Sequence, residues 1–232
     1  MESSPVTHAA NPTNLVVAID GPSGSGKSSV SKAVARALGA AYLDTGAMYR
    51  AITYSVLEAG TDLSDADAIA QAVRAATLEI SVDPDREQVV IGDTVVTDAI
   101  REPRISEQVS AVATNLEARA ELVRRQREII AANERIVAEG RDITTVVAPD
   151  AEARILLTAS EQARLRRRGI QLGGTQDANQ LQAQVLERDE KDSTVVNFTQ
   201  AADGVITVDS SDLDFEQTVA AVLDAIATAA KK

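Results

Sequence analysis

An eight-residue segment near the start of the chain holds the residues best suited to chemistry. Residues 21–28 read GPSGSGKS and match the pattern G-x-x-x-x-G-K-[S/T] at every position. Its glycines let the backbone curl so that successive N–H groups point at phosphate oxygens, Lys27 reaches the β- and γ-phosphates, and the Ser28 hydroxyl coordinates Mg²⁺. The segment predicts a nucleotide phosphate site made of Gly21, Pro22, Ser23, Gly24, Ser25, Gly26, Lys27, Ser28 and Ser29.

This motif requires a strand before it and a helix after it. Residues 15–19 read LVVAI, a continuous β-branched run that is typical of a buried parallel strand. Apolar residues recur at helical spacing from Ser28 to Leu38, and Gly39 stands where a helix C-cap belongs. The local sequence therefore predicts both the strand and the helix that the motif requires.

The rest of the chain alternates short apolar runs with helical patterns. We expect further strands at residues 42–43, 136–138, 155–158 and 205–208. This alternation predicts an α/β fold of the P-loop NTPase type, with a parallel sheet and helices on both faces. A β-rich stretch at residues 77–98, with a Gly92-Asp93 turn, predicts a small antiparallel insertion.

Two local features are predicted in the helical segments. Ser64 is expected to cap a helix that runs to about Ala76. The last helix, residues 215–229, is expected to bury one apolar face formed by Phe215, Val219, Val222, Leu223 and Ile226.

Composition narrows the choice of partners. The formal net charge is −12 and aromatic residues make up only 2% of the chain, which argues against a nucleic-acid partner. The chain has no cysteine, which fits the reducing cytosol, and no apolar run long enough to span a membrane. Residues 1–13 are polar and predict a disordered leader, and we expect a cytoplasmic monomer.

Two further clusters could bind a second anion. In residues 44–50, Thr45 and Gly46 can hydrogen-bond a phosphate and Arg50 can pair with it in a bidentate manner. Residues 139–142 read EGRD and follow a predicted core strand, where ligands of open α/β sheets bind. Each cluster alone could instead be structural: the first as a capped helix start with a solvated arginine, the second as a surface turn with an internal ion pair.

A basic helix is predicted after residue 160. Arg164, Arg167 and Arg168 share one face at helical spacing. They could supply charge to phosphates, or they could form a solvated basic face.

Together these segments resemble the bacterial cytidylate kinase family. The similarity lies in VVAIDGPSGSGKSS (16–29), YLDTGAMYRA (42–51), AIREPRISEQVSAVAT (99–114), RRQR (124–127), VAEGRDITTVVAPDA (137–151) and RDEKDS (188–193). The stretches fall in the family's order and cover nearly the whole chain.

The resemblance implies ATP-dependent phosphorylation of CMP, and of dCMP, with Mg²⁺. It implies that Lys27, Arg141, Asp142 and Arg188 are catalytic, and that Arg164 and Arg168 contact the ATP phosphates from a mobile lid. It implies a CMP site made of Thr45, Tyr49, Arg50, Ser110, Arg119, Arg141, Asp142, Arg188 and Asp192. It also implies one kinase domain, residues 14–232, with a core at 14–60 and 99–232, a monophosphate-binding insertion at about 61–98 and a lid at about 160–178.

Two positions depart from the family pattern. Val195 stands where the family has an arginine that helps to recognise the pyrimidine, so strict cytosine preference is in question. Thr144 stands where the family tends to have glycine, which would restrict a turn that needs positive φ. The alternatives left open are a P-loop kinase for another small acceptor such as UMP, and a non-catalytic P-loop nucleotide-binding protein.

Overall fold

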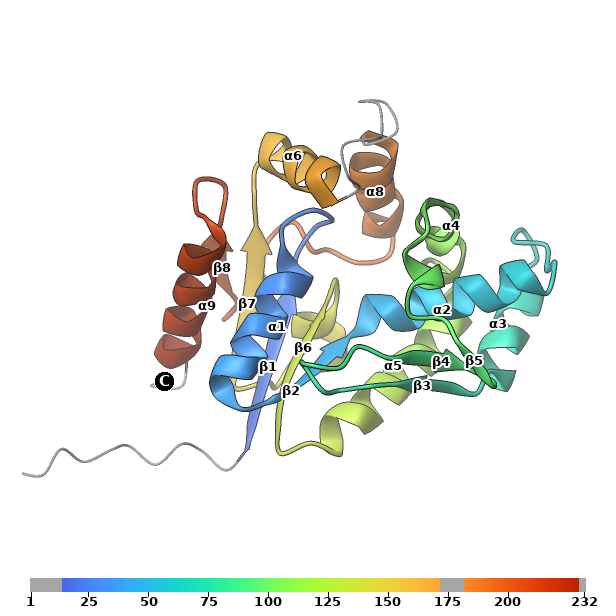
Figure 1. Ribbon diagram of the computed structural model, residues 1–232, viewed down its shortest axis with the longest axis horizontal. Coiled ribbons are helices and arrows are strands. Elements are labelled where there is room, and N and C mark those ends of the chain that lie inside the picture. The colour runs from blue at the N-terminus through green and yellow to red at the C-terminus, as the bar shows by residue number, and fades with distance from the viewer. Residues whose placement is uncertain (1–13, 172–181, 230–232) are drawn as a thin grey trace, which may run out of the picture.

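The computed structural model describes residues 14–171 and 182–229. Its larger sheet has five parallel strands in the order β2-β6-β1-β7-β8 (Figure 1). The strands are β1 (Leu15–Asp20), β2 (Ala41–Asp44), β6 (Arg135–Gly140), β7 (Ala153–Thr158) and β8 (Ile206–Asp209). The predicted α/β class and the parallel sheet are confirmed.

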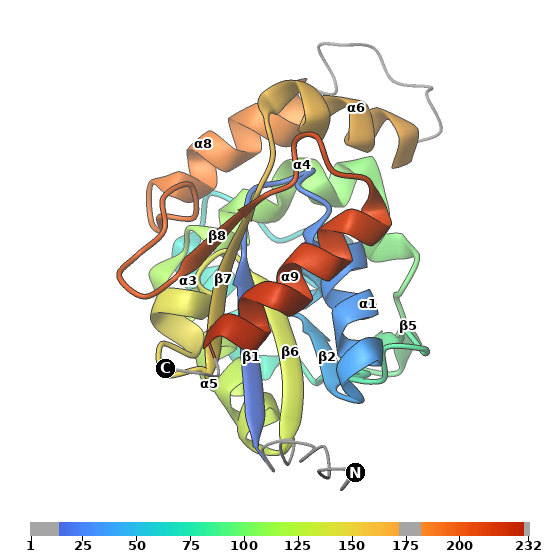
Figure 2. The same cartoon turned by 90° about the vertical axis from the view of Figure 1, so that its left-hand side faces the viewer.

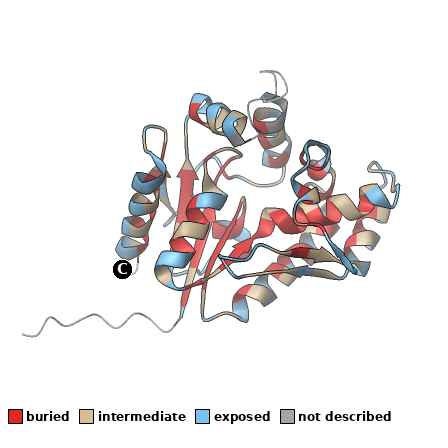
Figure 3. Cartoon of the chain, in the orientation of Figure 1, coloured by how far each residue is buried: buried red, intermediate tan, exposed pale blue. Residues whose placement is uncertain are grey.

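Helices cover both faces of this sheet. On one face lie α1 (Lys27–Leu38) and α9 (Phe215–Ala229), in front of the strands in Figure 2. The core of the other face is formed with α2 (Thr45–Glu58), α3 (Ala66–Ala75), α4 (Pro103–Ala113) and α5 (Leu116–Ala131). The two-residue period of a strand makes this possible: Val17 and Ile19 of β1 pack on the first face, and Ala18 packs on the second. Figure 3 shows the central strands of this sheet mostly buried between the helices.

The predicted insertion forms a second, antiparallel sheet. It consists of β3 (Leu78–Ile80), β4 (Val89–Ile91) and β5 (Thr94–Val95), with Gly92 in a positive-φ turn between the last two. The sheet packs on α2. The loop that follows β3 meets the larger sheet, because Tyr42 N donates to Val82 O at 2.8 Å.

Further helical segments complete the fold. They are η1 (Ala99–Arg101), η2 (Ile143–Val147), α6 (Glu161–Gln171), η3 (Ala183–Glu187) and α8 (Arg188–Ser193). Figure 1 shows α6 and α8 beyond the carboxyl ends of the strands. Within residues 14–171 and 182–229, no helix is long and apolar enough to cross a bilayer.

Two sequence predictions are wrong in detail. Asp65, not Ser64, caps α3, because its carboxylate accepts the Ala68 N–H and Ser64 instead donates to Asp62. Phe215 does not belong to the buried face of α9: 47% of the residue is exposed, whereas Val222 and Ile226 are buried. At the first position of the helix, its ring lies beyond the end of the core that the later residues fill.

Helix α5 offers a matched test of the core. Leu122 is fully buried, and Leu116 in the same helix is 72% exposed. We predict that Leu122→Ala lowers the free energy of unfolding by about 2–5 kcal/mol through lost burial and a cavity. Leu116→Ala should change it by less than about 0.5 kcal/mol. Urea unfolding of both variants measures the difference, and equal effects would contradict the assigned core.

Candidate active site

The Gly-rich loop joins β1 to α1 at the carboxyl edge of the sheet. Gly26 has φ of 87° and precedes the first residue of α1, where no side chain caps the helix. The first amides of α1 therefore remain available to an anion, at the positive end of the helix dipole. At Gly24, a Cβ atom would lie 2.8 Å from the Arg164 carbonyl oxygen, so glycine permits α6 to pack against the loop.

Glu139 links the loop to the neighbouring strand β6. Its carboxylate accepts the Ser28 hydroxyl at 2.6 Å through Oε1 and lies 3.1 Å from Lys27 Nζ through Oε2. Only 2% of Glu139 is exposed. Glu139 belongs to the EGRD cluster at residues 139–142, but no role was predicted for it from the sequence. The available signal was an acidic residue at the carboxyl end of a core strand, but the pairing of β1 with β6 could not be read from the chain.

The second predicted anion site lies at the start of α2, after the neighbouring strand β2. Asp44 caps α2 by accepting the Ala47 N–H at 2.8 Å, and it also accepts from Arg50 Nη2 at 2.9 Å. The Thr45 hydroxyl donates to the Glu139 carbonyl oxygen at 2.8 Å. Arg50 and Thr45 are thus held close to the residue that contacts Lys27.

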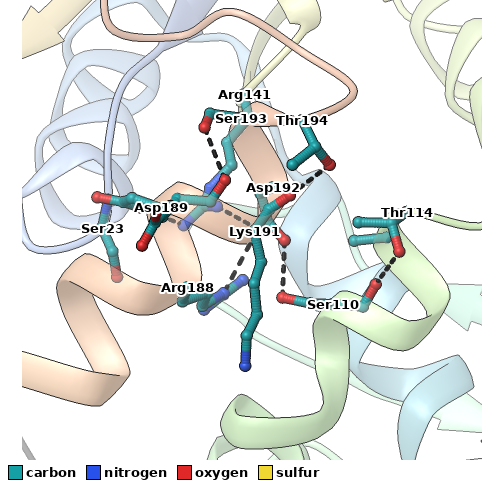
Figure 4. Close-up of polar contacts among 12 residues, drawn as sticks. Ser23, Ser110, Thr114, Arg141, Arg188, Asp189, Lys191, Asp192, Ser193 and Thr194 are labelled. Atoms are coloured by element: carbon teal, nitrogen blue, oxygen red, sulfur yellow. Dashed lines mark hydrogen bonds and ion pairs between the residues drawn. The ribbon is translucent and has the colours of Figure 1, made fainter.

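Arg141 is held by two carboxylates of α8 (Figure 4). It donates to Asp189 at 2.6 Å and pairs with Asp192. Its guanidinium also lies 4.6 Å from the centre of the Phe198 ring, a cation–π distance. These contacts fix a cation that comes from the end of β6 against a helix that is distant in sequence.

Asp189 and Asp192 also connect the site to other elements. Asp189 accepts the Ser23 N–H of the loop at 3.1 Å and pairs with Arg164 of α6. Asp192 accepts the Ser110 hydroxyl of α4 at 2.8 Å. Asp189 was not among the predicted site residues, because its role arises from contacts across the fold.

Burial acts on the charges of this region. It lowers the pKa of Arg188, with Arg141 acting in the same direction. Burial also raises the pKa of Asp142, although its ion pair with Arg119 opposes the shift. A desolvated guanidinium is stabilised by an anion, so the region favours binding of phosphate.

A single cavity of about 760 Å³ joins the two predicted anion sites. Most of the predicted site residues line it: Pro22, Ser23, Gly24, Gly26, Lys27, Ser28, Ser29, Thr45, Tyr49, Arg50, Arg119, Arg141, Asp142, Arg168, Arg188 and Asp192. Gly21, Ser25, Ser110 and Arg164 do not line it. Ser110 and Arg164 lie behind the lining, where they hold Asp192 and Asp189.

The donor set near the loop fits Mg²⁺. This ion prefers oxygen ligands and is usually held by few protein groups together with substrate phosphates. The Ser28 hydroxyl lies in the cavity with the Glu139 carboxylate beside it. In the part of the chain that the structure describes, no group of three or more His, Cys, Asp or Glu side chains could hold a metal by itself.

Thr144 fits its position without strain. No non-glycine residue among those described has positive φ, so the glycine at this position in the family is not needed for the turn. Thr144 donates to Asp20 Oδ2 through its N–H at 2.9 Å and through its hydroxyl at 2.6 Å. Burial raises the pKa of Asp20 to about 6, and these hydrogen bonds oppose the shift.

The parallel sheet, the Gly-rich loop and the cavity at the strand ends define a P-loop nucleotide-binding protein of the small-molecule kinase type. The sequence profile of the cytidylate kinase family matches residues 17–228, and the chain belongs to this family. The predicted resemblance is therefore confirmed.

Similar proteins agree with this assignment. A cytidylate kinase of Cutibacterium acnes is 48% identical over 91% of this chain and 96% of its own. One of Nocardia farcinica is 49% identical over 89% of this chain and 91% of its own. Among solved structures, a gluconokinase from Sinorhizobium meliloti aligns with a TM-score of 0.51 and 18% identity over 94% of each chain, which shows a shared fold.

The contact between Asp20 and Thr144 leads to a prediction about Thr144, which stands where the family tends to have glycine. Thr144→Val keeps the shape but removes the hydroxyl that donates to a buried carboxyl group. We predict a loss of roughly 1–3 kcal/mol in the free energy of unfolding, and a clearly smaller loss for Thr144→Ser, which keeps the donor. Urea unfolding provides both values. A Val variant as stable as the unmodified protein would show that the hydroxyl contributes nothing.

Proposed function

We propose that this chain transfers the γ-phosphate of ATP to CMP, and to dCMP, giving ADP with CDP or dCDP. The observation that carries the proposal is the single cavity lined both by Lys27 and Ser28 and by Thr45, Arg50 and Arg141. The names of the relatives supply the acceptor. A transferable phosphate and its acceptor must occupy one cavity, since direct transfer requires the reacting atoms to be about 3–3.5 Å apart.

In this proposal, the acceptor phosphate is bound by Thr45, Arg50 and Arg141. Tyr49 and Asp142 line the same pocket, Asp192 binds the ribose, and Arg119 faces the cytosine. Ser110, which was expected to face the cytosine, lies behind the lining and holds Asp192. Arg188 lies near the phosphates being joined. The burial of the Arg188 guanidinium supports this role, because a desolvated cation interacts strongly with charge that develops in the transition state.

The donor phosphates are bound by residues 21–29, with Lys27 at the β- and γ-phosphates. Ser28 is the protein ligand of Mg²⁺, which would neutralise phosphate charge when bound. Glu139 holds the Lys27 ammonium and the Ser28 hydroxyl at the mouth of the loop before the nucleotide binds. Arg168 of α6 completes the donor side. Arg164, which was expected to contact the ATP phosphates, instead holds Asp189 behind the lining.

The transfer is an in-line displacement. A phosphate oxygen of CMP attacks the γ-phosphorus, a new O–P bond forms, and the bond to the β-phosphate oxygen breaks with its electron pair leaving on ADP. The second pKa of a phosphate is about 6, so the acceptor is largely ionised near neutral pH and no strong general base is needed. The protein contributes position and positive charge.

Lid and insertion movements would exclude water. The proposed lid, residues 160–178, includes α6, and residues 172–178 lie outside the described residues. The proposed insertion, residues 61–98, reaches α1 through the Arg36–Asp85 pair at 2.7 Å. Closing these elements over the substrates would suppress hydrolysis of ATP. The protein is proposed to act as a cytoplasmic monomer.

Val195 bears on the choice of pyrimidine. It lies just after α8, beside Val196, which lines the cavity. Without the family arginine, selection of cytosine over uracil would depend on Arg119, since Ser110 lies behind the cavity lining. UMP is therefore the acceptor most worth comparing with CMP.

An acceptor panel tests the proposal. With ATP and Mg²⁺, we expect product from CMP and dCMP, less from UMP, and least from AMP. Val195→Arg should widen the preference for CMP over UMP. ATP binding without any product would instead favour a non-catalytic nucleotide-binding protein.

Lys27→Ala separates transfer from folding. Losing a cation that stabilises the transferring group costs roughly 3–4 kcal/mol, so CDP formation should fall at least about 100-fold. Circular dichroism should show an unchanged fold. Near-normal turnover would contradict the assigned donor site.

Arg50→Ala tests the acceptor site. We predict a rise of about 10-fold or more in the KM for CMP, with the KM for ATP changed less than about 2-fold, because Arg50 pairs with the acceptor phosphate only. Steady-state kinetics with each substrate varied in turn gives both constants. Equal changes in the two constants would remove Arg50 from the acceptor site.

A further inference from the structure

Phe198 is the largest side chain that the described residues bury completely. Only 1% of it is exposed, whereas Asn197 and Thr199 on either side of it are exposed. Phe198 nevertheless belongs to none of the three buried apolar clusters of the described residues. The other phenylalanine of the chain, Phe215, lines the cavity and is 47% exposed. A buried ring outside these clusters must find its main contact elsewhere.

The Phe198 ring contacts the guanidinium of Arg141. The guanidinium carbon lies over the ring, 4.6 Å from its centre. A cation in this position is attracted by the negative face of the ring, and the attraction is stronger where water is excluded. The Arg141 side chain is 14% exposed and the ring is buried, so most water is excluded from this pair.

The other partners of Arg141 lie at the edge of its guanidinium. Nη2 donates to Asp189 at 2.6 Å, and Nη1 pairs with Asp192 (Figure 4). The N–H groups of a guanidinium point outward in its plane, so carboxylates and phosphates compete for the same donors. The Phe198 ring occupies the face instead, where no N–H group points. A phosphate that displaces the carboxylates from Arg141 therefore leaves the contact with Phe198 in place.

Local hydrogen bonds hold the backbone on both sides of Phe198. At the end of α8, the Asp192 carbonyl oxygen accepts the Val195 N–H at 3.3 Å. Directly before the ring, the Asn197 side-chain oxygen accepts the Thr199 N–H at 3.2 Å and the Thr199 hydroxyl at 3.3 Å. An asparagine that bonds the amide two residues further on forms a compact turn. The ring is thus presented to Arg141 from a fixed segment.

We propose that Phe198 is a positioning residue of the acceptor site, whose ring keeps the Arg141 guanidinium oriented while its edge passes from the carboxylates of α8 to the acceptor phosphate. This inference rests on the proposed function, because it takes Arg141 to bind that phosphate. The ring matters most in the bound state, since the phosphate then competes with the carboxylates that otherwise hold Arg141. Binding of CMP should therefore depend on the ring, and binding of a nucleotide at residues 21–29 should not.

The first test removes the ring and compares two ligands. Calorimetric titration of the full chain with CMP and with ADP, both with Mg²⁺, gives two affinities for each variant. Phe198→Leu keeps a buried apolar side chain but removes the ring. It should weaken CMP binding by about 2- to 30-fold, the range of one cation–π contact, and leave ADP binding within about 2-fold. Tyr54→Leu is the matched control, because the Tyr54 ring contacts Arg104 at 5.7 Å and neither residue lines the cavity.

A second series separates the contact with the cation from packing. Phenylalanine analogues with one, two or three fluorine atoms on the ring, incorporated at position 198, nearly keep its shape and progressively weaken its negative face. The affinity for CMP should fall with each added fluorine, whereas the affinity for ADP should stay constant. This series also decides the question if Phe198→Leu does not fold, and circular dichroism verifies the fold of each protein.

The outcomes separate the positioning role from the proposed function. An unchanged CMP affinity in Phe198→Leu, equal losses for CMP and ADP, or a CMP affinity that does not respond to fluorine would overturn the positioning role. The predicted loss of CMP binding in a protein that forms no CDP would support the positioning role and overturn the kinase activity. A failure of the unmodified protein to bind CMP would overturn both.

Discussion

Three partly buried arginines of the cavity are each paired with a carboxylate before any substrate arrives, and the site is built around these ion pairs. A guanidinium that loses water without a partner is costly. Arg141 is paired with Asp189 and Asp192, Arg50 with Asp44, and Arg119 with Asp142. In a chain with a formal net charge of −12, these pairs keep a concentrated set of cations folded in one place. Substrate phosphates can then share the cations with the carboxylates already present.

The carboxylates also place the elements of the site relative to one another. Asp189 touches the phosphate loop, α6 and the end of β6, and Glu139 touches the loop from the neighbouring strand. The parallel sheet makes this possible, because the loops that follow β1, β2 and β6 emerge at the same edge. In the proposed function, the β1–α1 unit supplies the donor site, and the segments after β6 and β2 supply the acceptor site. Strand order would then bring the donor and acceptor groups together.

Much of the fold follows from local sequence. The run before Gly21 and the spacing after Ser28 predict β1 and α1, and the Gly92-Asp93 turn predicts the small antiparallel sheet. The Gly-rich loop is also a local motif, so its residues could be named directly. Thr45, Arg50 and Arg141 could be named as possible anion ligands from their residue types and their places after predicted strands. Their assignment to one acceptor site came only from resemblance to a family, since nothing in the chain alone brings Arg50 and Arg141 to one cavity.

What could not be predicted depends on contacts between distant segments. The roles of Glu139 and Asp189 arise where strands and helices meet, and helical spacing does not reveal them. Phe215 satisfied the apolar period of α9, yet its place at the end of the helix leaves it in the cavity. Thr144 was expected to restrict a turn, but its hydroxyl instead binds Asp20 across the fold.

The central claim is that the two anion sites face each other in one cavity. Binding of a bisubstrate ligand tests this claim most directly. Adenosine and cytidine joined through five phosphates would span both anion sites if they face each other in one cavity. Linking two ligands makes the second binding event intramolecular, so the account predicts an affinity at least about 100-fold higher than that of either ATP or CMP, at one ligand per chain. An affinity no better than that of ATP, or CMP that still binds beside the linked ligand, would contradict it.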